Sequence, residues 1–394
     1  MTANNRWLLP EGIEELLPDQ AQRLEQWRRT LLDLFRSWGY QLVIPPLVEH
    51  LDSLLTGVGS DLELDTFKII DPQSGRLLGV RADITPQVAR IDAHRLRREI
   101  PSRLCYIGPV LRTHTTPAAN TRNPMQVGAE LYGHHGIESD FEILMLMLEC
   151  LSAMGLKDVA IDIGHVGLYR ALIDQSMLSP EDSKRLFEAL QRKSVPDIEE
   201  TVQKCRMSPT LADAFILLAN LNGDSSILDE AQVLTSMGSG VEEALQQLQA
   251  LTKLLQTHLP SYPLHFDLAE LRGYAYHTGV VFAAFVPGFG QEIAAGGRYD
   301  NIGKAFGHGR AATGFSSDLM TISSLMEEPK SDDKAIYAPY CADSNWLLRI
   351  RELRAQGETV ICGLPRQSGG GRQMRCDREL RRKDGQWVVK KIES

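Results

Sequence analysis

The sequence lacks any apolar stretch long enough to span a membrane as a helix, which excludes a helical membrane protein. Its most apolar segment, 141–154, is interrupted by Glu142 and Glu149. The first seven residues, Met-Thr-Ala-Asn-Asn-Arg-Trp, lack the apolar core of a signal peptide. The six cysteines show no C-x-x-C spacing, so neither a disulfide framework nor a zinc site is indicated. We therefore expect a cytoplasmic protein without a cofactor or a metal.

The chain also lacks an excess of positive charge: 42 Lys and Arg residues stand against 51 Asp and Glu residues, and the formal net charge is -9. A protein that binds tRNA usually presents a basic face to the phosphates. Residues 346–394 nevertheless carry a net charge of +6, and the remaining residues carry -15. This basic tail could contact nucleic acid, but a solvated face or a contact for an acidic protein partner is the better interpretation.

The remaining composition is that of a globular protein: 394 residues, 43% of them hydrophobic and 24% charged, enough for two to three domains. Apolar residues recur at helical spacing after Pro18, which predicts a helix with Asp19 as its N-cap and Gly39 at its end. A strand-like segment, 40–48, follows and contains Pro45 and Pro46.

Alternating and β-branched patterns predict strands or hairpins at 67–70, 77–80, 103–111, 125–132, 159–163 and 262–268. Thr85 and Pro86 carry the signature of a helix start. In strand 125–132, Gln126 and Glu130 lie four residues apart, so their side chains lie on one face. A buried helix is expected at 139–154, and a helical region at 166–259.

The stretch 271–314 concentrates the polar chemistry of the chain. We expect a strand at 280–286 and its hairpin partner at 291–295, followed by Gly296 and Gly297, which would let a ligand approach the backbone. The side chains expected around that gap are Arg272, Tyr276, His277, Arg298 and Tyr299. A glycine-rich hairpin with surface arginines remains the alternative. The adjacent His134 and His135 make a weak metal site, because neighbouring side chains on a strand point to opposite faces.

Two motifs in this stretch carry a specific resemblance. The segment Leu-Arg-Gly-Tyr-Ala-Tyr, 271–276, resembles the histidine-specific signature of the histidyl-tRNA synthetases, and Ala-Gly-Gly-Arg-Tyr-Asp, 295–300, resembles their second signature. The helix and strand before residue 48 are similar to motif 1 of the class II synthetases, which builds the dimer interface in that family. Segments 103–132 and 311–321 are similar to motifs 2 and 3.

The chain departs from the synthetases where they bind ATP. Arg112 keeps the position of the motif 2 arginine, but Thr113 and His114 stand where a basic residue and the adenine-reading glutamate would follow. Thr321 occupies the position of the motif 3 arginine, and a hydroxyl cannot replace a guanidinium at a phosphate. Two of the main ATP-binding features are therefore missing. The chain resembles the synthetase-like regulatory subunits of ATP phosphoribosyltransferase, which have lost aminoacylation.

The resemblance implies a histidine-binding site and no catalytic residues. Asp83, Thr85 and Gln126 would hold the ammonium group, and Arg112 or Arg272 the carboxylate. The residues expected around the imidazole are Glu130, Tyr276, His277 and Tyr299. Tyr276-His277 departs from the Tyr-Tyr pair of many synthetases, and Ala275 replaces an aspartate.

The expected fold is α+β: a class II aminoacyl-tRNA synthetase-like antiparallel sheet flanked by helices over 1–325, with a helical insertion at about 166–259. A short α/β C-terminal domain would cover 326–394. The resemblance implies a non-catalytic subunit that activates the short catalytic subunit, mediates feedback inhibition by L-histidine, dimerises through the motif 1 region and assembles into a hetero-octamer. The alternatives are a divergent histidyl-tRNA synthetase and a tRNA-binding module, although the acidic net charge disfavours nucleic acid.

Overall fold

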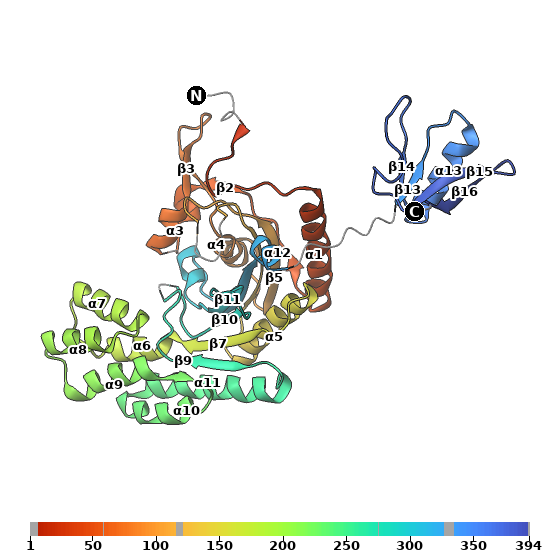
Figure 1. The fold of residues 1–394 in the computed structure, drawn as a ribbon. Coiled ribbons are helices and arrows are strands. Elements are labelled where there is room, and N and C mark those ends of the chain that lie inside the picture. Colours follow the sequence, from red (N-terminus) through yellow and green to blue (C-terminus); the bar gives the residue numbers. More distant parts are fainter. Residues whose placement is uncertain (1–6, 58, 116–120, 275, 327–334, 393–394) are drawn as a thin grey trace. The chain divides into compact units, whose positions relative to one another are not determined.

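The computed structural model describes residues 7–57, 59–115, 121–274, 276–326 and 335–392. The chain divides into two compact units, Met1–Met326 and Glu327–Ser394 (Figure 1). Among the described residues, no helix combines the length and the apolar character that crossing a bilayer requires.

The first unit is built on a nine-stranded sheet, counted over the described residues, in the order β1-β5-β6-β12-β11-β10-β7-β9-β8. The strands are β1 (Gln41–Leu42), β5 (Ser102–Pro109), β6 (Met125–Tyr132), β7 (Ala160–His165), β8 (Asn222–Gly223), β9 (Leu264–Asp267), β10 (Val280–Phe285), β11 (Ala294–Arg298) and β12 (Ala312–Asp318). Neighbours pair antiparallel except for β1 with β5 and β7 with β9. The expected α+β fold is thus confirmed.

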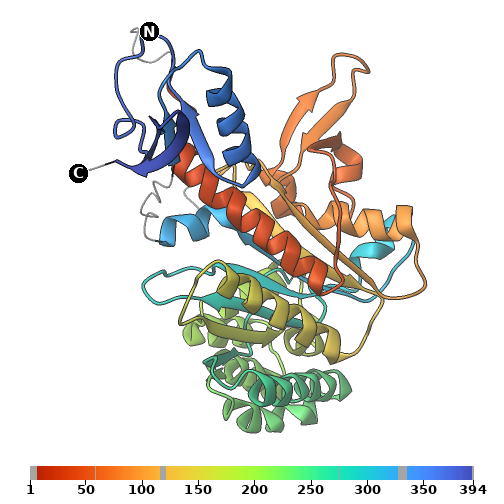
Figure 2. The ribbon, with the colours of Figure 1, turned by 90° about the vertical axis from the view of Figure 1, so that its right-hand side faces the viewer.

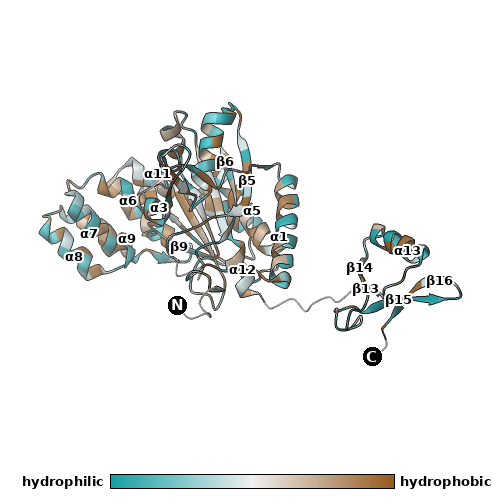
Figure 3. Ribbon diagram, turned by 90° about the horizontal axis from the view of Figure 1, so that it is seen from above, coloured by the Kyte–Doolittle hydropathy of each residue, from teal (hydrophilic) through white to brown (hydrophobic). Residues whose placement is uncertain are grey.

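One face of this sheet is covered by α5 (Ile137–Ala153), and α1 (Pro18–Ser37) packs against α5 (Figure 2). Their apolar residues join the core of the sheet, where Phe35, Ile143 and Phe315 are buried. Colouring by hydropathy shows the amphipathic character of α1, along which teal and brown alternate (Figure 3). The last helix of the unit, α12 (Leu319–Leu325), follows β12 directly.

A smaller sheet lies beside the first, with strands in the order β2-β4-β3. Its elements and the short helices around it are β2 (Val48–His50), α2 (Leu51–Leu54), α3 (Ser60–Asp65), β3 (Phe67–Ile70), β4 (Leu77–Val80), α4 (Thr85–Arg90), η2 (Ile91–Leu96) and η4 (Ile302–Phe306). The predicted hairpin 67–70/77–80 is confirmed. The strand expected at 40–48 is instead two short strands separated by Pro45 and Pro46, which cannot donate to a ladder.

Two predicted helix caps are displaced. Helix α1 starts at Pro18, whose fixed φ suits the first helical position, so Leu17 is the N-cap and Asp19 lies in the first turn. Helix α4 starts at Thr85, and the Asp83 Oδ1 atom accepts the Thr85 N–H over 3.0 Å. Thr85 is thus the first residue of the helix rather than its cap, and Asp83 accepts the free N–H of Thr85, whose hydroxyl lies 3.0 Å from that of Tyr106.

The region between β7 and β9 is mostly helical and extends from the β7–β9 end of the sheet (Figure 1). It contains α6 (Val166–Ile173), α7 (Pro180–Gln191), α8 (Val195–Lys204), α9 (Pro209–Asn220), α10 (Ile227–Glu230), η3 (Ala231–Met237) and α11 (Ser239–His258). Ser179 caps α7, because its side chain accepts the Asp182 N–H. We call residues 166–259 the helical insertion.

The second unit has a four-stranded sheet in the order β14-β13-β15-β16, with one helix among its described residues. Its elements are β13 (Ala335–Ala338), α13 (Ser344–Ala355), β14 (Thr359–Cys362), β15 (Arg378–Lys383) and β16 (Gln386–Lys391). Parallel β13 and β14 flank α13, and β15 and β16 form a hairpin. The second unit is thus a β-α-β unit followed by a hairpin.

Candidate functional site

On one face of the large sheet, two glycines on adjacent strands lie between a glutamate and a valine. Glu130 of β6 pairs in register with Gly314 of β12, which pairs with Gly297 of β11, which in turn pairs with Val281 of β10. A Cβ atom on Gly314 would overlap the carboxylate of Glu130, so only glycine leaves room for that group. The sheet thus provides a floor of small residues with one buried carboxyl group at its side.

Glu130 lies at the centre of a hydroxyl network. The Tyr106 hydroxyl donates to its Oε1 atom over 3.1 Å, and the Tyr299 hydroxyl donates to Oε2. Tyr106 and the Thr85 hydroxyl are 3.0 Å apart. Burial raises the pKa of Glu130 to about 8, and the charge of Asp83 acts in the same direction, against the opposing effect of the hydroxyl donors. At neutral pH this carboxyl group is mainly protonated.

A second group of bonds fixes Asp83 and Gln126. The Gln126 Nε2 atom donates to Asp83 Oδ1 over 2.8 Å, and Gln126 Oε1 accepts the Ile84 N–H over 2.9 Å. The Thr85 N–H also donates to Asp83 Oδ1, so both of these bonds fall on the same carboxylate oxygen. The structure thus brings Asp83, Thr85, Gln126, Glu130 and Tyr299 into one connected polar network.

A cavity of about 810 Å³ opens beside this network. Asp83, Thr85 and Tyr276 line it, and the helical insertion contributes part of its wall, whereas the buried network residues Gln126, Glu130 and Tyr299 line neither this cavity nor the smaller one described below. The wall residues from α6, α7 and the segment before β3 include Tyr169, Phe187, Gly59 and Leu62. Its volume is within the range usual for small-molecule sites.

A smaller cavity of about 90 Å³ is lined by Arg272, Tyr276 and His277. Tyr276 lines both cavities and is 45% exposed. Its ring stacks on His277, with centroids 4.3 Å apart. Burial lowers the pKa of His277 to about 4, so its ring is neutral at physiological pH. Arg272 pairs with Glu270 at 3.2 Å and lies 3.8 Å from Glu292.

Two expected arginines lie elsewhere. Arg112 donates from Nε to the Ala82 carbonyl over 3.3 Å and lines neither cavity. The expectation that Arg298 faces the gap is wrong: its Nη2 atom lies 2.7 Å from Asp140 on α5. Because Arg298 precedes Tyr299 at the end of β11, the two side chains point to opposite faces. The substituted position, Ala275, lies outside the described residues.

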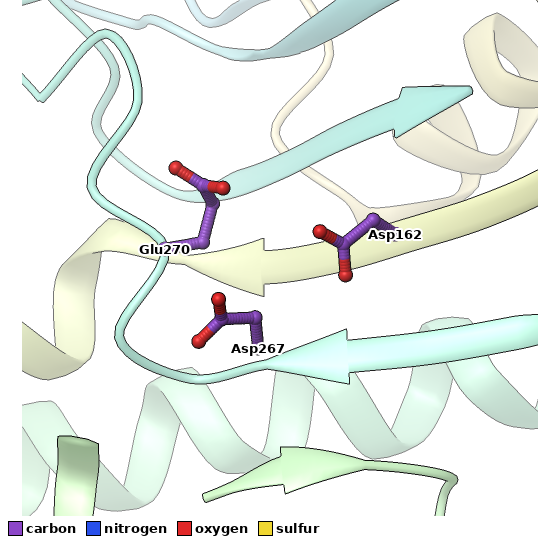
Figure 4. Close-up of side chains that lie close together, drawn as sticks. All are labelled: Asp162, Asp267 and Glu270. Atoms are coloured by element: carbon purple, nitrogen blue, oxygen red, sulfur yellow. The ribbon is translucent and has the colours of Figure 1, made fainter. Parts of the chain in front are cut away.

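The structure brings together three carboxylates, Asp162, Asp267 and Glu270, that the sequence analysis did not identify (Figure 4). One oxygen from each lies within 4.8 Å of the others, a spacing that fits a cation. Protein cations already pair with two of the three carboxylates, because Lys193 lies 2.7 Å from Asp267 and Arg272 lies 3.2 Å from Glu270, and the His265 ring lies 2.8 Å from Asp162. The members come from β7, β9 and the turn after β9, so no local sequence pattern could reveal them.

The two substituted ATP positions have other roles in the fold. The Thr321 hydroxyl donates to Asp318 Oδ2 over 2.6 Å, within the cap of α12. His114 is exposed, and its Nδ1 atom lies 2.8 Å from the Thr113 hydroxyl. Neither side chain supplies a fixed cation or a carboxylate to the floor of small residues.

Comparison with known families matches both units. Residues 12–322 match the model of the histidyl-tRNA synthetase family, and residues 333–390 match that of the ATP phosphoribosyltransferase subunit HisZ C-terminal domain.

Proteins named ATP phosphoribosyltransferase regulatory subunit are similar over the whole chain. The one from Nitrosococcus oceani is 51% identical over 392 residues, covering 100% of this chain and 98% of the relative. The one from Thioalkalivibrio sulfidiphilus is 52% identical, covering 99% of each chain.

Solved structures agree. An ATP phosphoribosyltransferase regulatory subunit/histidyl-tRNA synthetase from Bacillus halodurans has a TM-score of 0.80 at 25% identity, covering 91% of this chain and 93% of that one. Histidyl-tRNA synthetase from Nostoc has a TM-score of 0.78 at 17% identity, covering 95% of this chain and 91% of that one, a likeness of fold alone.

Proposed function

The chain belongs to the family of ATP phosphoribosyltransferase regulatory subunits, and we propose that it binds L-histidine beside Glu130 and regulates the first step of histidine biosynthesis without catalysis of its own. The partner would be the short catalytic subunit, which the chain activates and through which histidine inhibits.

The polar network supports an amino-acid ligand. Both bonds described above fall on Oδ1 of Asp83, so Oδ2 is the oxygen that an ammonium group would contact, with the Thr85 hydroxyl beside it. Arg272 would take the carboxylate, because it lines the smaller cavity next to Tyr276. We keep Arg112 as the alternative partner for the carboxylate, although it lines neither cavity.

The single observation that carries the proposal is the buried Glu130, held between the hydroxyls of Tyr106 and Tyr299 in a chain of this family. A neutral imidazole offers one donor and one acceptor. A protonated carboxyl group offers both as well, so Glu130 can bond the ring without a buried unpaired charge. Neutral His277 and the Tyr276 ring would complete the aromatic surroundings of the ligand.

The absence of catalysis follows in this proposal from Thr321 and His114. Adenylate formation needs charge at the phosphates and a reader for adenine, and the Thr321 hydroxyl is instead bound to Asp318. The chain would form a self-dimer through the α1 region, and a hetero-octamer with the catalytic subunit. We place it in the cytoplasm, in keeping with the six cysteines, none of which forms a disulfide bond in the structure.

Reconstitution tests this function. The purified short catalytic subunit is assayed for product formation from ATP and phosphoribosyl pyrophosphate, alone and with this chain, over a series of L-histidine concentrations. Activity should rise when the chain is added and fall with histidine, and Glu130→Ala should abolish the histidine effect. Unchanged activity on addition of the chain would contradict the proposal. Histidine can inhibit only through a conformation that it prefers, so the inhibition must follow its binding curve.

A further inference from the structure

The turn that carries Arg272, Tyr276 and His277 is held by a side chain of the helical insertion. We call residues 271–277 the ligand turn. Arg170 of α6 donates from one nitrogen, Nη2, to two carbonyls of this turn, that of Tyr274 over 2.7 Å and that of His277 over 2.8 Å. Its guanidinium also lies over the Tyr274 ring, 4.5 Å from the centroid. A single arginine therefore bonds to the turn on both sides of Tyr276.

Further contacts join the insertion to the same segment. The Tyr274 ring packs against Tyr169 of α6 and Phe187 of α7, with centroid distances of 5.1 and 5.4 Å. Lys193, just after α7, pairs with Asp267 at the end of β9, where the chain enters the ligand turn. The insertion thus contacts the end of β9, which precedes the ligand turn, and the turn itself.

Short-range bonds support the described residues of the turn: the Tyr274 N–H donates to the Leu271 carbonyl over 3.0 Å and the Arg272 N–H to Glu270 Oε1 over 2.6 Å, and His277 Nδ1 lies 3.2 Å from the Arg298 carbonyl. The N–H groups of Tyr276 and His277 both donate to the Gly273 carbonyl over 2.9 Å, and Gly273 has a φ of 62°, in the left-handed region. The ligand turn lies between β9 and β10, outside the ladders of the sheet. Hydrogen bonds between residues three or four positions apart do not by themselves prevent local opening of a loop. The carbonyls of Tyr274 and His277 keep their direction because Arg170 bonds them.

We propose that Arg170 is a positioning residue for the histidine site, and that through it the helical insertion acts as part of that site rather than as a separate appendage. The inference rests on the proposed function, since it names the residue that orients the ring-contacting side chains. Among the described residues of the ligand turn, Arg170 contacts two backbone carbonyls and the Tyr274 ring, and not the side chains of Tyr276 and His277. Its effect on ligand binding is therefore indirect, through the placement of Tyr276 and His277.

The test uses the full chain and three proteins: the wild type, Arg170→Ala and the control Arg185→Ala. Arg185 lies on α7 of the same insertion and forms an ion pair with exposed Glu181 at 2.9 Å. Hydrogen exchange of the peptide that covers the ligand turn is measured without ligand, the Tm is measured by calorimetry, and the Kd of L-histidine by titration. Should Arg170→Ala fail to fold, Arg170→Lys, which keeps the charge and one nitrogen donor, supplies the comparison.

In Arg170→Ala we expect faster exchange in the ligand turn and a Kd for histidine raised about tenfold or more, the loss that one or two charge-assisted hydrogen bonds produce. Exchange in β6 and β12 should stay unchanged, and Arg185→Ala should match the wild type. Unchanged exchange in the turn, or a general rise in exchange together with a collapse of the Tm, would overturn the positioning role. A wild type that binds no histidine would refute the proposed function, while the exchange comparison would still decide whether Arg170 holds the turn.

Discussion

Replacing Glu130 with glutamine tests whether a protonated carboxyl group is buried beside the floor of small residues. Burial raises the pKa of Glu130 to about 8 from the usual 4.5 of a glutamate. The folded state therefore keeps a proton that the unfolded chain has lost above pH 4.5. The stability that Glu130 contributes is fully present below about pH 4.5 and is lost as the pH rises through about 8.

The size of this effect follows from the two pKa values. Between pH 5 and pH 8, proton linkage at this one group lowers the free energy of unfolding by roughly 3–4 kcal/mol. Glutamine resembles the protonated form and has no proton to lose. The difference in unfolding free energy between Glu130→Gln and the wild type should therefore shift by roughly that amount, in favour of the variant, as the pH rises.

Urea unfolding of both proteins, followed by circular dichroism at pH 5, 6, 7 and 8, measures this difference. Buried His165 and His277 titrate in the opposite sense, because burial lowers the pKa of each to about 4, but they cancel in the comparison of the two proteins. Glu188→Gln, an exposed change on α7, is the control and should follow the wild type. Parallel curves for Glu130→Gln and the wild type would refute the idea of a protonated Glu130.

Arg298→Met should lower the free energy of unfolding by about 3–5 kcal/mol, because it leaves the buried Asp140 carboxylate unpaired; a loss under 1 kcal/mol in urea unfolding would contradict this. Gly314→Ala should lower the Tm and abolish histidine binding, since its methyl group would displace Glu130; calorimetry with normal values for both would show that the floor tolerates a side chain. Asp83→Asn should weaken histidine binding about tenfold with little change in Tm, through loss of a charge-assisted hydrogen bond, and an unchanged Kd would remove Asp83 from the ammonium site.

Elements with a clear side-chain pattern could be predicted from the sequence. Strand β6 has the expected bounds, Met125–Tyr132, because apolar and polar residues mark both of its faces. The hairpin of β3 and β4 is confirmed for the same reason, together with the turn residues between its strands.

The bounds of strand β11 could not be predicted from the sequence. The sequence predicts a strand at 291–295, whereas the structure has Ala294–Arg298. Alanines and glycines give no alternation of polar and apolar side chains, so nothing in the segment fixes its bounds. Arg298 follows the two glycines and was therefore expected at the gap, whereas its side chain binds Asp140 on the opposite face.

Contacts between distant segments were also beyond the sequence. Arg170 is 107 residues from His277, and Lys193 meets Asp267 across the boundary of the insertion. Such pairs depend on how the insertion packs on the sheet, which no local periodicity encodes. The motifs pointed to the residues around the proposed ligand site, but not to the residues that hold them in place.

A calorimetric titration of the purified chain with L-histidine, repeated with ATP, tests the central claim most directly. We expect saturable binding of histidine, no binding of ATP, and no histidyl-adenylate when both ligands are present. Binding of ATP with formation of the adenylate would contradict the account and assign the chain to the active synthetases.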